Sequence, residues 1–97
     1  MRPYVVRPAA AEDIRRAYTW YERARPGLGE EFLVEVRAAI GPVVTAPESY
    51  PVLHRETRRA LIRRFPYGLF YRVVDEIVVF VACTHTRREP ERWKRRR

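Results

Sequence analysis

The segment Ile77–Cys83 constrains the fold more than any other part of the chain, because it is an unbroken run of apolar residues rich in β-branched side chains. A strand with one solvent-facing side alternates apolar and polar residues, whereas a strand buried on both faces is apolar throughout. We therefore predict a central strand at 77–83 that is buried on both sides. It ends abruptly in the polar residues 84–88, where side chains can be placed on a rigid support.

Two more strands are predicted before this one. Leu61, Ile62 and Phe65 lie among the arginines of 58–64, and Tyr67–Val74 is rich in β-branched and aromatic residues, as strands favour. Asp75–Glu76 is then a tight charged turn. Alternate residues of 67–74 must point to opposite faces of the sheet.

The first half of the chain predicts a short strand at Tyr4–Val6 and a helical hairpin. Apolar residues recur at helical spacing from about Ala9 to Ala24, after Pro8, and again from about Leu28. Pro26 and Gly27 stop the first helix. Gly41–Pro42 falls inside the second, and because proline removes a backbone hydrogen bond we expect a kink or an early end there.

These elements predict an α+β fold of order β-α-α-β-β-β, with three or four strands after the hairpin. The helical hairpin should pack on one face of a small, twisted, mainly antiparallel sheet. We expect residues 1–97 to form one domain with a basic C-terminal tail at about 89–97. In this tail Pro90 can open a helical turn and Trp93 can pack back on the sheet. Two alternatives for the tail's cations stay open, namely a solvated end and a contact with phosphate.

Charge points to anionic partners. The chain has 20 Lys+Arg against 12 Asp+Glu, a net charge of +8, and arginine forks bind phosphate and carboxylate bidentately. Nucleic acid or an acidic protein would fit, as would a solvated basic surface without a partner. The single cysteine, Cys83, is expected to be a buried thiol in a reducing compartment. With no apolar leader or membrane-length segment, we expect a soluble cytoplasmic protein without membrane contact.

Few residues carry recognisable chemistry. No glycine-rich phosphate loop, metal-binding constellation or Ser/His/Asp arrangement is present in the sequence, so we expect no metal and no cofactor. His85 stands near Arg87 at the end of the central strand. An acid or base beside arginines is the minimum for metal-free RNA cleavage, although His85 can also simply hydrogen-bond locally. His54 is expected to be a surface residue.

The order of the motifs PAAAEDI, WYE, PGLGEEFL, RRFPYGLFYRV and CTHTRREPERW resembles the RelE/ParE superfamily of bacterial toxins. This resemblance implies the toxin half of a type II toxin–antitoxin module, neutralised by a cognate antitoxin. It also implies a helical hairpin on a twisted sheet. Part of the sheet face away from the helices would then lie under the antitoxin.

The superfamily has two branches, and the resemblance favours the second. RelE-like members cut mRNA on the ribosome, and ParE-like members poison DNA gyrase. Of the nuclease positions, only Arg87 matches cleanly, and Arg59 retains one half of a basic pair. Gly68 stands where the nucleases have an arginine, Leu61 replaces half of a basic pair, and Trp93 falls near a terminal tyrosine.

The leading hypothesis is therefore a ParE-like toxin that inhibits DNA gyrase by binding. Its candidate contact residues are Arg58, Arg59, Arg63, Arg64, Arg87, Arg88 and Trp93. The alternative is a ribosome-dependent endoribonuclease with Arg59, His85 and Arg87 as catalytic residues, so enzymatic activity is left open. A third hypothesis is a toxin remnant or a basic nucleic-acid-binding domain without toxicity.

Overall fold

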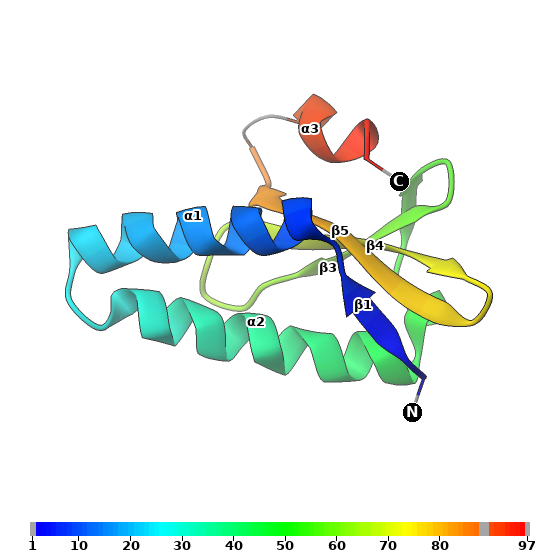
Figure 1. Cartoon of the computed structure of the whole chain (residues 1–97), viewed down its shortest axis with the longest axis horizontal. Coiled ribbons are helices and arrows are strands. Elements are labelled where there is room, and N and C mark those ends of the chain that lie inside the picture. Colours follow the sequence, from blue (N-terminus) through cyan, green and yellow to red (C-terminus); the bar gives the residue numbers. More distant parts are fainter. Residues whose placement is uncertain (1, 88–89, 97) are drawn as a thin grey trace.

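The computed structural model describes residues 2–87 and 90–96. In chain order the elements are β1 (Tyr4–Val6), α1 (Pro8–Ala24), α2 (Leu28–Thr45), the 3-10 helix η1 (Pro47–Ser49), β2 (Val52–His54), β3 (Thr57–Leu61), β4 (Tyr67–Val74), β5 (Ile77–His85) and α3 (Pro90–Lys94). The α1–α2 hairpin lies against one side of the sheet, and α3 lies near the other end of α1 from the hairpin turn (Figure 1). The predicted α+β class and helical hairpin are confirmed.

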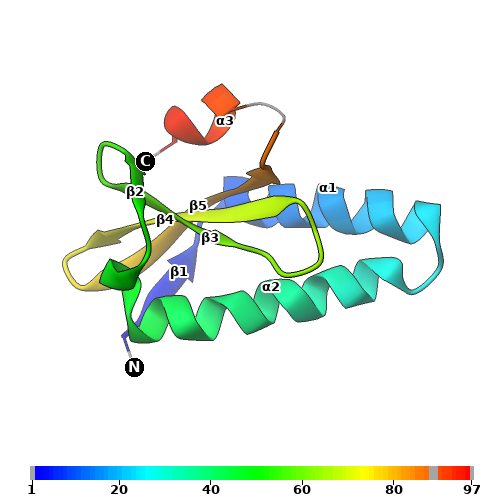
Figure 2. The ribbon, with the colours of Figure 1, turned by 180° about the vertical axis from the view of Figure 1, so that it is seen from behind.

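The five strands form one sheet in the order β1-β5-β4-β3-β2. β1 pairs parallel to β5, and the other three pairs are antiparallel. Figure 2 shows the same arrangement from behind, with β2 and β3 in front of β5. Four strands follow the hairpin, the upper end of the predicted number.

β5 lies between two neighbours and is buried on both faces, as predicted. On the face covered by the helices, Phe80 and Cys83 belong to the larger apolar cluster. On the other face, Val79 and Ala82 pack with Phe70 and Trp93 in a second cluster. A continuous apolar run was needed because both sides of this strand are covered by protein.

The second cluster is closed by the chain itself. α3 brings the Trp93 ring onto the Phe70 ring, stacked at 4.4 Å between centroids, and Trp93 is only 8% exposed. The predicted helical turn at Pro90 and the packing of Trp93 are therefore confirmed. At Phe70, the sheet face that we expected to find under an antitoxin is covered by α3 instead.

Glycines and one carboxylate determine how the helical hairpin turns. Gly27 has a φ of 91° and ends the connection between the helices, a conformation that glycine adopts without strain. The Glu22 carboxylate accepts the backbone N–H groups of Gly27 and Gly29 at 2.9 and 3.0 Å. It thereby caps the N-terminus of α2 from the neighbouring helix, where no capping side chain is supplied locally.

The expected early end of α2 at Pro42 is wrong. The helix continues to Thr45, and Val43 and Val44 beyond the proline are 0% and 1% exposed. The Ala46 N–H donates to the Pro42 carbonyl at 3.0 Å, so the last turn keeps its hydrogen bonding. Burial of two valine side chains, about 1.5 kcal/mol or more each, outweighs the one missing backbone hydrogen bond. None of the helices among the described residues is long and apolar enough to cross a bilayer.

Tyr71 gives a testable pH dependence. Its hydroxyl donates to the Pro47 carbonyl at 2.6 Å, and burial, the main cause, raises the pKa of Tyr71 to about 12. The folded pKa is above the unfolded value, so the folded state keeps this proton longer. The contribution of Tyr71 to stability is complete below about pH 10 and is lost as the pH rises through about 12.

Tyr71→Phe should lower the free energy of unfolding at neutral pH by about 1 kcal/mol, through the lost hydrogen bond. It should also flatten the decline in stability of the wild-type protein above pH 10. Urea unfolding of both proteins from neutral to strongly alkaline pH measures this. An equally steep alkaline decline in the variant would show that Tyr71 does not titrate as described.

Candidate functional site

A groove of about 450 Å³ lies at the C-terminal end of β5, between α1, the loop before β4, and α3. We call it the β5-end groove. Its lining residues are Asp13, Arg16, Ala17, Trp20, Tyr21, Pro66, Tyr67, Cys83, Thr84, His85 and Arg92. Aromatic rings and cations therefore meet in one recess, which is a composition typical of a protein-binding surface.

α1 provides one wall of the groove through residues one helical turn apart. Ala17 and Tyr21 are buried in the core, whereas Arg16 and Trp20 are exposed. Trp20 is 61% exposed, and its ring meets the Tyr21 ring edge-on at 5.2 Å between centroids. A large aromatic ring held by one edge and open on the other is suited to anchoring a partner.

The opposite wall is the end of the β4–β5 pair. Tyr67 lies opposite His85 in the strand register, and their rings are 5.6 Å apart between centroids. The Thr86 N–H donates to the Pro66 carbonyl at 2.9 Å. This bond ties the loop before β4 to the end of β5, so the groove rests on a rigid support.

His85 makes the local hydrogen bond that was one of its two sequence-based alternatives. Its Nδ1 accepts the Arg87 backbone N–H at 3.1 Å, and the Arg87 side chain is exposed. Since Nδ1 is used in this bond, His85 stabilises the turn that follows β5. Among the described residues, no group of three or more His, Cys, Asp or Glu side chains could hold a metal ion.

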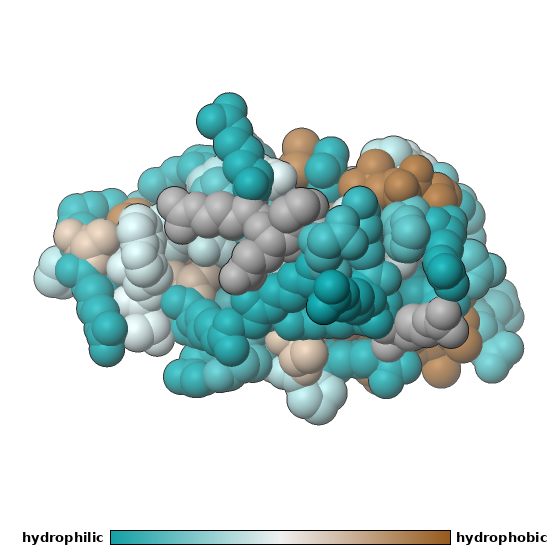
Figure 3. Space-filling model, turned by 90° about the horizontal axis from the view of Figure 1, so that it is seen from above, coloured by the Kyte–Doolittle hydropathy of each residue, from teal (hydrophilic) through white to brown (hydrophobic). Residues whose placement is uncertain are grey.

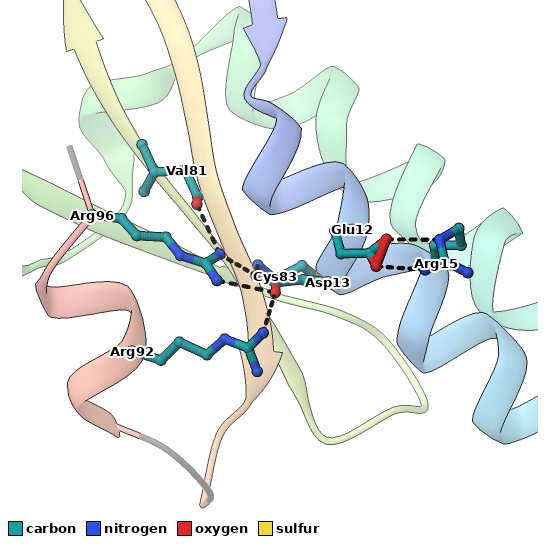
Figure 4. Close-up of polar contacts among 7 residues, drawn as sticks. All are labelled: Glu12, Asp13, Arg15, Val81, Cys83, Arg92 and Arg96. Atoms are coloured by element: carbon teal, nitrogen blue, oxygen red, sulfur yellow. Dashed lines mark hydrogen bonds and ion pairs between the residues drawn. The ribbon is translucent and has the colours of Figure 1, made fainter.

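Asp13 joins three elements beneath the groove (Figure 4). Its side chain is 2% exposed. It accepts the backbone N–H of Cys83 at 3.0 Å, ion-pairs with Arg92 at 3.2 Å, and accepts hydrogen bonds from Arg96 on both oxygens. Arg96 also donates to the Val81 carbonyl at 3.2 Å. α3 is therefore fastened to both α1 and β5.

Cys83 is confirmed as a buried free thiol. Burial, with a smaller contribution from the Asp13 carboxylate, raises the pKa of the Cys83 thiol well above its ordinary value. The thiolate is the nucleophilic form of cysteine. Cys83 therefore belongs to the core and is not a reactive group of the groove.

The side chain of Arg59 packs directly against Gly68. A Cβ atom at Gly68 would lie 2.9 Å from Cδ and 3.1 Å from Cγ of Arg59, and 3.2 Å from Cε1 of Phe70. The aliphatic part of Arg59 thus passes over Gly68 and occupies the space that a side chain there would need. The Arg59 Nε is buried and has no hydrogen-bond partner among the described residues.

The proposed catalytic residues do not meet in one cluster. Arg59 pairs with Phe70 in the register, and its side chain lies on the sheet face with Trp93. His85 contacts Tyr67, which packs against the cluster on the helix side. Arg59 and His85 are therefore on opposite faces of the sheet.

Two of the other predicted contact residues hold the fold together. Arg58 donates to the carbonyls of Glu48 and Tyr50 at 3.1 and 2.6 Å, which secures the segment after α2. Arg64, with a φ of 70°, donates to Glu31 at 2.7 Å. That bond lowers the pKa of Glu31 and links the β3–β4 loop to α2.

The remaining predicted contact residues differ in accessibility. Arg63 is exposed, close in sequence to Pro66 of the groove, while Trp93 is buried against Phe70. Arg88 lies outside the described residues. Arg63 and Arg87 therefore have exposed side chains, as does Arg64, which is paired with Glu31.

Sequence reasoning missed Asp13 and Arg16 as groove residues, and it treated Trp20 as the least certain of the core aromatic residues of the first helix. The available signal was helical spacing, because Trp20 falls off the apolar stripe of α1 and follows Arg16 by one turn. For Asp13 there was no signal, since an acidic residue in the first turn of a helix is ordinarily a favourable dipole contact.

Comparison with known proteins gives one family match and similar solved structures. Residues 4–90 match the sequence model of a family described as ParE toxin of type II toxin-antitoxin system, parDE. Among solved structures, the fold is similar to a chain of the "Chromosomal ParDE TA system from P. aeruginosa", with a TM-score of 0.78 and 16% identity, over 88% of this chain and 96% of that one. At this identity the structural likeness concerns the fold alone. No curated protein matches the sequence.

Proposed function

Because this chain belongs to the ParE family of type II toxins, we propose that it inhibits DNA gyrase by binding through the β5-end groove, and that a cognate antitoxin neutralises it. Binding, unlike cleavage, requires no acid or base at a reacting atom. It requires an accessible anchor with complementary charge around it.

The observation that carries this proposal is that the Arg59 side chain occupies the space next to Gly68. A nuclease of the related branch would place an arginine there, but the Arg59 side chain already fills the position. His85 lies on the other sheet face and uses Nδ1 to hold a backbone N–H. Arg59 and His85 therefore cannot stabilise the same pentavalent phosphate together.

The β5-end groove supplies what a binding mechanism needs. Trp20 is an exposed aromatic anchor, and tryptophan and arginine are the residues that most often dominate binding energy. Arg16 and Arg92 line the recess, and Arg63 and Arg87 stand near it in the chain. We propose that gyrase contacts this groove through an apolar side chain flanked by carboxylates.

The positive charge of the chain indicates what kind of antitoxin would bind it. With a net charge of +8 and many exposed arginines, the chain suits an acidic partner whose flexible segment folds as it binds. Because Trp93 already covers Phe70, we propose that the antitoxin contacts regions outside that cluster.

Trp20→Ala should raise the toxin concentration that gives half-maximal inhibition of gyrase supercoiling by about tenfold or more, as loss of a hot-spot aromatic does. The measurement is conversion of relaxed plasmid to supercoiled plasmid by purified gyrase, with toxin titrated in. Val34→Ala is the matched control, since Val34 is an equally accessible apolar residue (56% exposed) on the outside of α2.

The proposal fails if the wild-type chain neither binds gyrase nor inhibits supercoiling. A parallel reaction with translating ribosomes decides the alternative. Cuts in mRNA that are in register with codons would identify a ribosome-dependent nuclease, and intact mRNA is the expected result. Equal inhibition by wild type and Trp20→Ala would leave gyrase as the target but remove the β5-end groove as the contact.

A further inference from the structure

A second hollow, also of about 450 Å³, lies between the β2–β3 hairpin and α3. We call it the hairpin hollow. Its lining residues are His54, Arg55, Glu56, Thr57, Arg72, Lys94, Arg95 and Arg96. Both ribbon views place the C-terminal end of the described chain beside the hairpin (Figures 1 and 2). Two segments far apart in sequence therefore combine their cations in one place.

The charge of the hairpin hollow is unbalanced. Among the described residues, five arginine and lysine side chains line it, against the single carboxylate of Glu56. That carboxylate is paired with Arg72 at 2.7 Å, and Arg96 is committed to the buried Asp13. Lys94 is 3.4 Å from the exposed Glu91.

Two cations remain for a ligand. Arg55 and Arg95 are exposed, and neither takes part in an ion pair among the described residues. Both line the hollow, Arg55 from the turn between β2 and β3 and Arg95 from the position directly after α3. Two cations that line one recess attract an anion that can contact both.

The lining also indicates which kind of anion fits. A protein partner is usually held by apolar or aromatic anchors in a desolvated pocket. The residues that line the hairpin hollow in the described part of the chain include no large apolar side chain. Phosphate groups need only charge and hydrogen-bond donors, such as arginine, lysine and threonine. The surface seen from the α3 side is largely hydrophilic, with apolar area gathered toward one end (Figure 3).

We propose that the hairpin hollow binds the phosphodiester backbone of a nucleic acid, with Arg55 and Arg95 as the principal contacts and Lys94 as a supporting one. Contacts of this kind carry no base specificity, because they reach only phosphate and sugar. The site is separate from the β5-end groove, so this inference does not depend on gyrase inhibition.

Fluorescence anisotropy with a short labelled DNA duplex, and with a labelled RNA strand of the same length, tests the site on the toxin alone. The double variant Arg55→Glu/Arg95→Glu should bind about tenfold or more weakly at low salt. The slope of log K against log salt should fall by about 2, one for each lost phosphate contact. Thermal unfolding checks that the variant is folded.

Arg23→Glu/Arg37→Glu is the matched control, because it makes the same change in net charge at exposed positions on the helical hairpin. It should retain most of the affinity. Preference for DNA or for RNA identifies the source of the backbone, and either one supports the site. Equal weakening in the two double variants, no binding of either nucleic acid, or binding of inorganic phosphate alone would overturn the proposal.

Discussion

Replacing Gly29 with alanine should lower the free energy of unfolding by about 3 kcal/mol, combining the cost of overpacking with the loss of a helix cap. A Cβ atom at Gly29 would lie 2.8 Å from the Tyr18 carbonyl oxygen, 2.8 Å from Cδ2 of the same residue, and 2.9 Å from Oε1 of Glu22. A backbone carbonyl in the middle of α1 cannot move aside alone. α1 and α2 must separate instead, and Glu22 must release the N-terminus of α2.

Urea unfolding monitored by circular dichroism measures this difference. Gly41→Ala is the matched control, because Gly41 lies in the same helix and an added Cβ would meet nothing within 4 Å. Its stability should change by no more than about 1 kcal/mol. If Gly29→Ala were as stable as Gly41→Ala, the close crossing of the two helices at Gly29 would be disproved.

Asp13→Asn should lower the free energy of unfolding by about 3 kcal/mol, because it removes the buried carboxylate with which the partly buried guanidinium groups of Arg92 and Arg96 pair. The asparagine oxygen can still accept the Cys83 N–H, but Arg92 and Arg96 lose the carboxylate that fastens α3. α3 should therefore detach before the rest of the chain unfolds.

Tryptophan fluorescence follows this detachment. In a Trp20→Phe background Trp93 is the only tryptophan, and its emission should shift to the red when it leaves Phe70. Glu12→Gln is the matched control, since it removes the same charge one residue earlier, where the carboxylate pairs with Arg15 on the surface. It should leave both stability and emission unchanged. Identical behaviour of the two variants would refute the role of Asp13.

Detachment of α3 should affect the two proposed sites differently. Arg92 belongs to the β5-end groove, and Arg95 to the hairpin hollow. If Asp13 holds α3 in place, Asp13→Asn should weaken nucleic-acid binding at the hollow. A gyrase contact centred on Trp20, on α1, should be retained more fully.

The sequence by itself determined the order of the elements and which faces are apolar. The run Ile77–Cys83 specified a strand covered on both sides, and helical spacing specified the two helices. These conclusions hold because apolar periodicity reports directly on the face that each element buries. The motif PGLGEEFL also anticipated the hairpin, although the structure was needed to show that Gly29 serves helix contact and Gly27 the turn.

The tertiary structure alone decided which polar groups meet. Asp13 accepts hydrogen bonds from a backbone N–H 70 residues away and from Arg96 83 residues away. From the sequence alone, any arginine of the chain could have paired with it. Strand register decided that Arg59 and His85 face opposite sides, because a shift of one residue would exchange the faces. Burial of Val43 and Val44 decided that α2 passes Pro42. Each of these results depends on packing and charge interactions between residues that are far apart in the sequence, and local sequence patterns do not report such interactions.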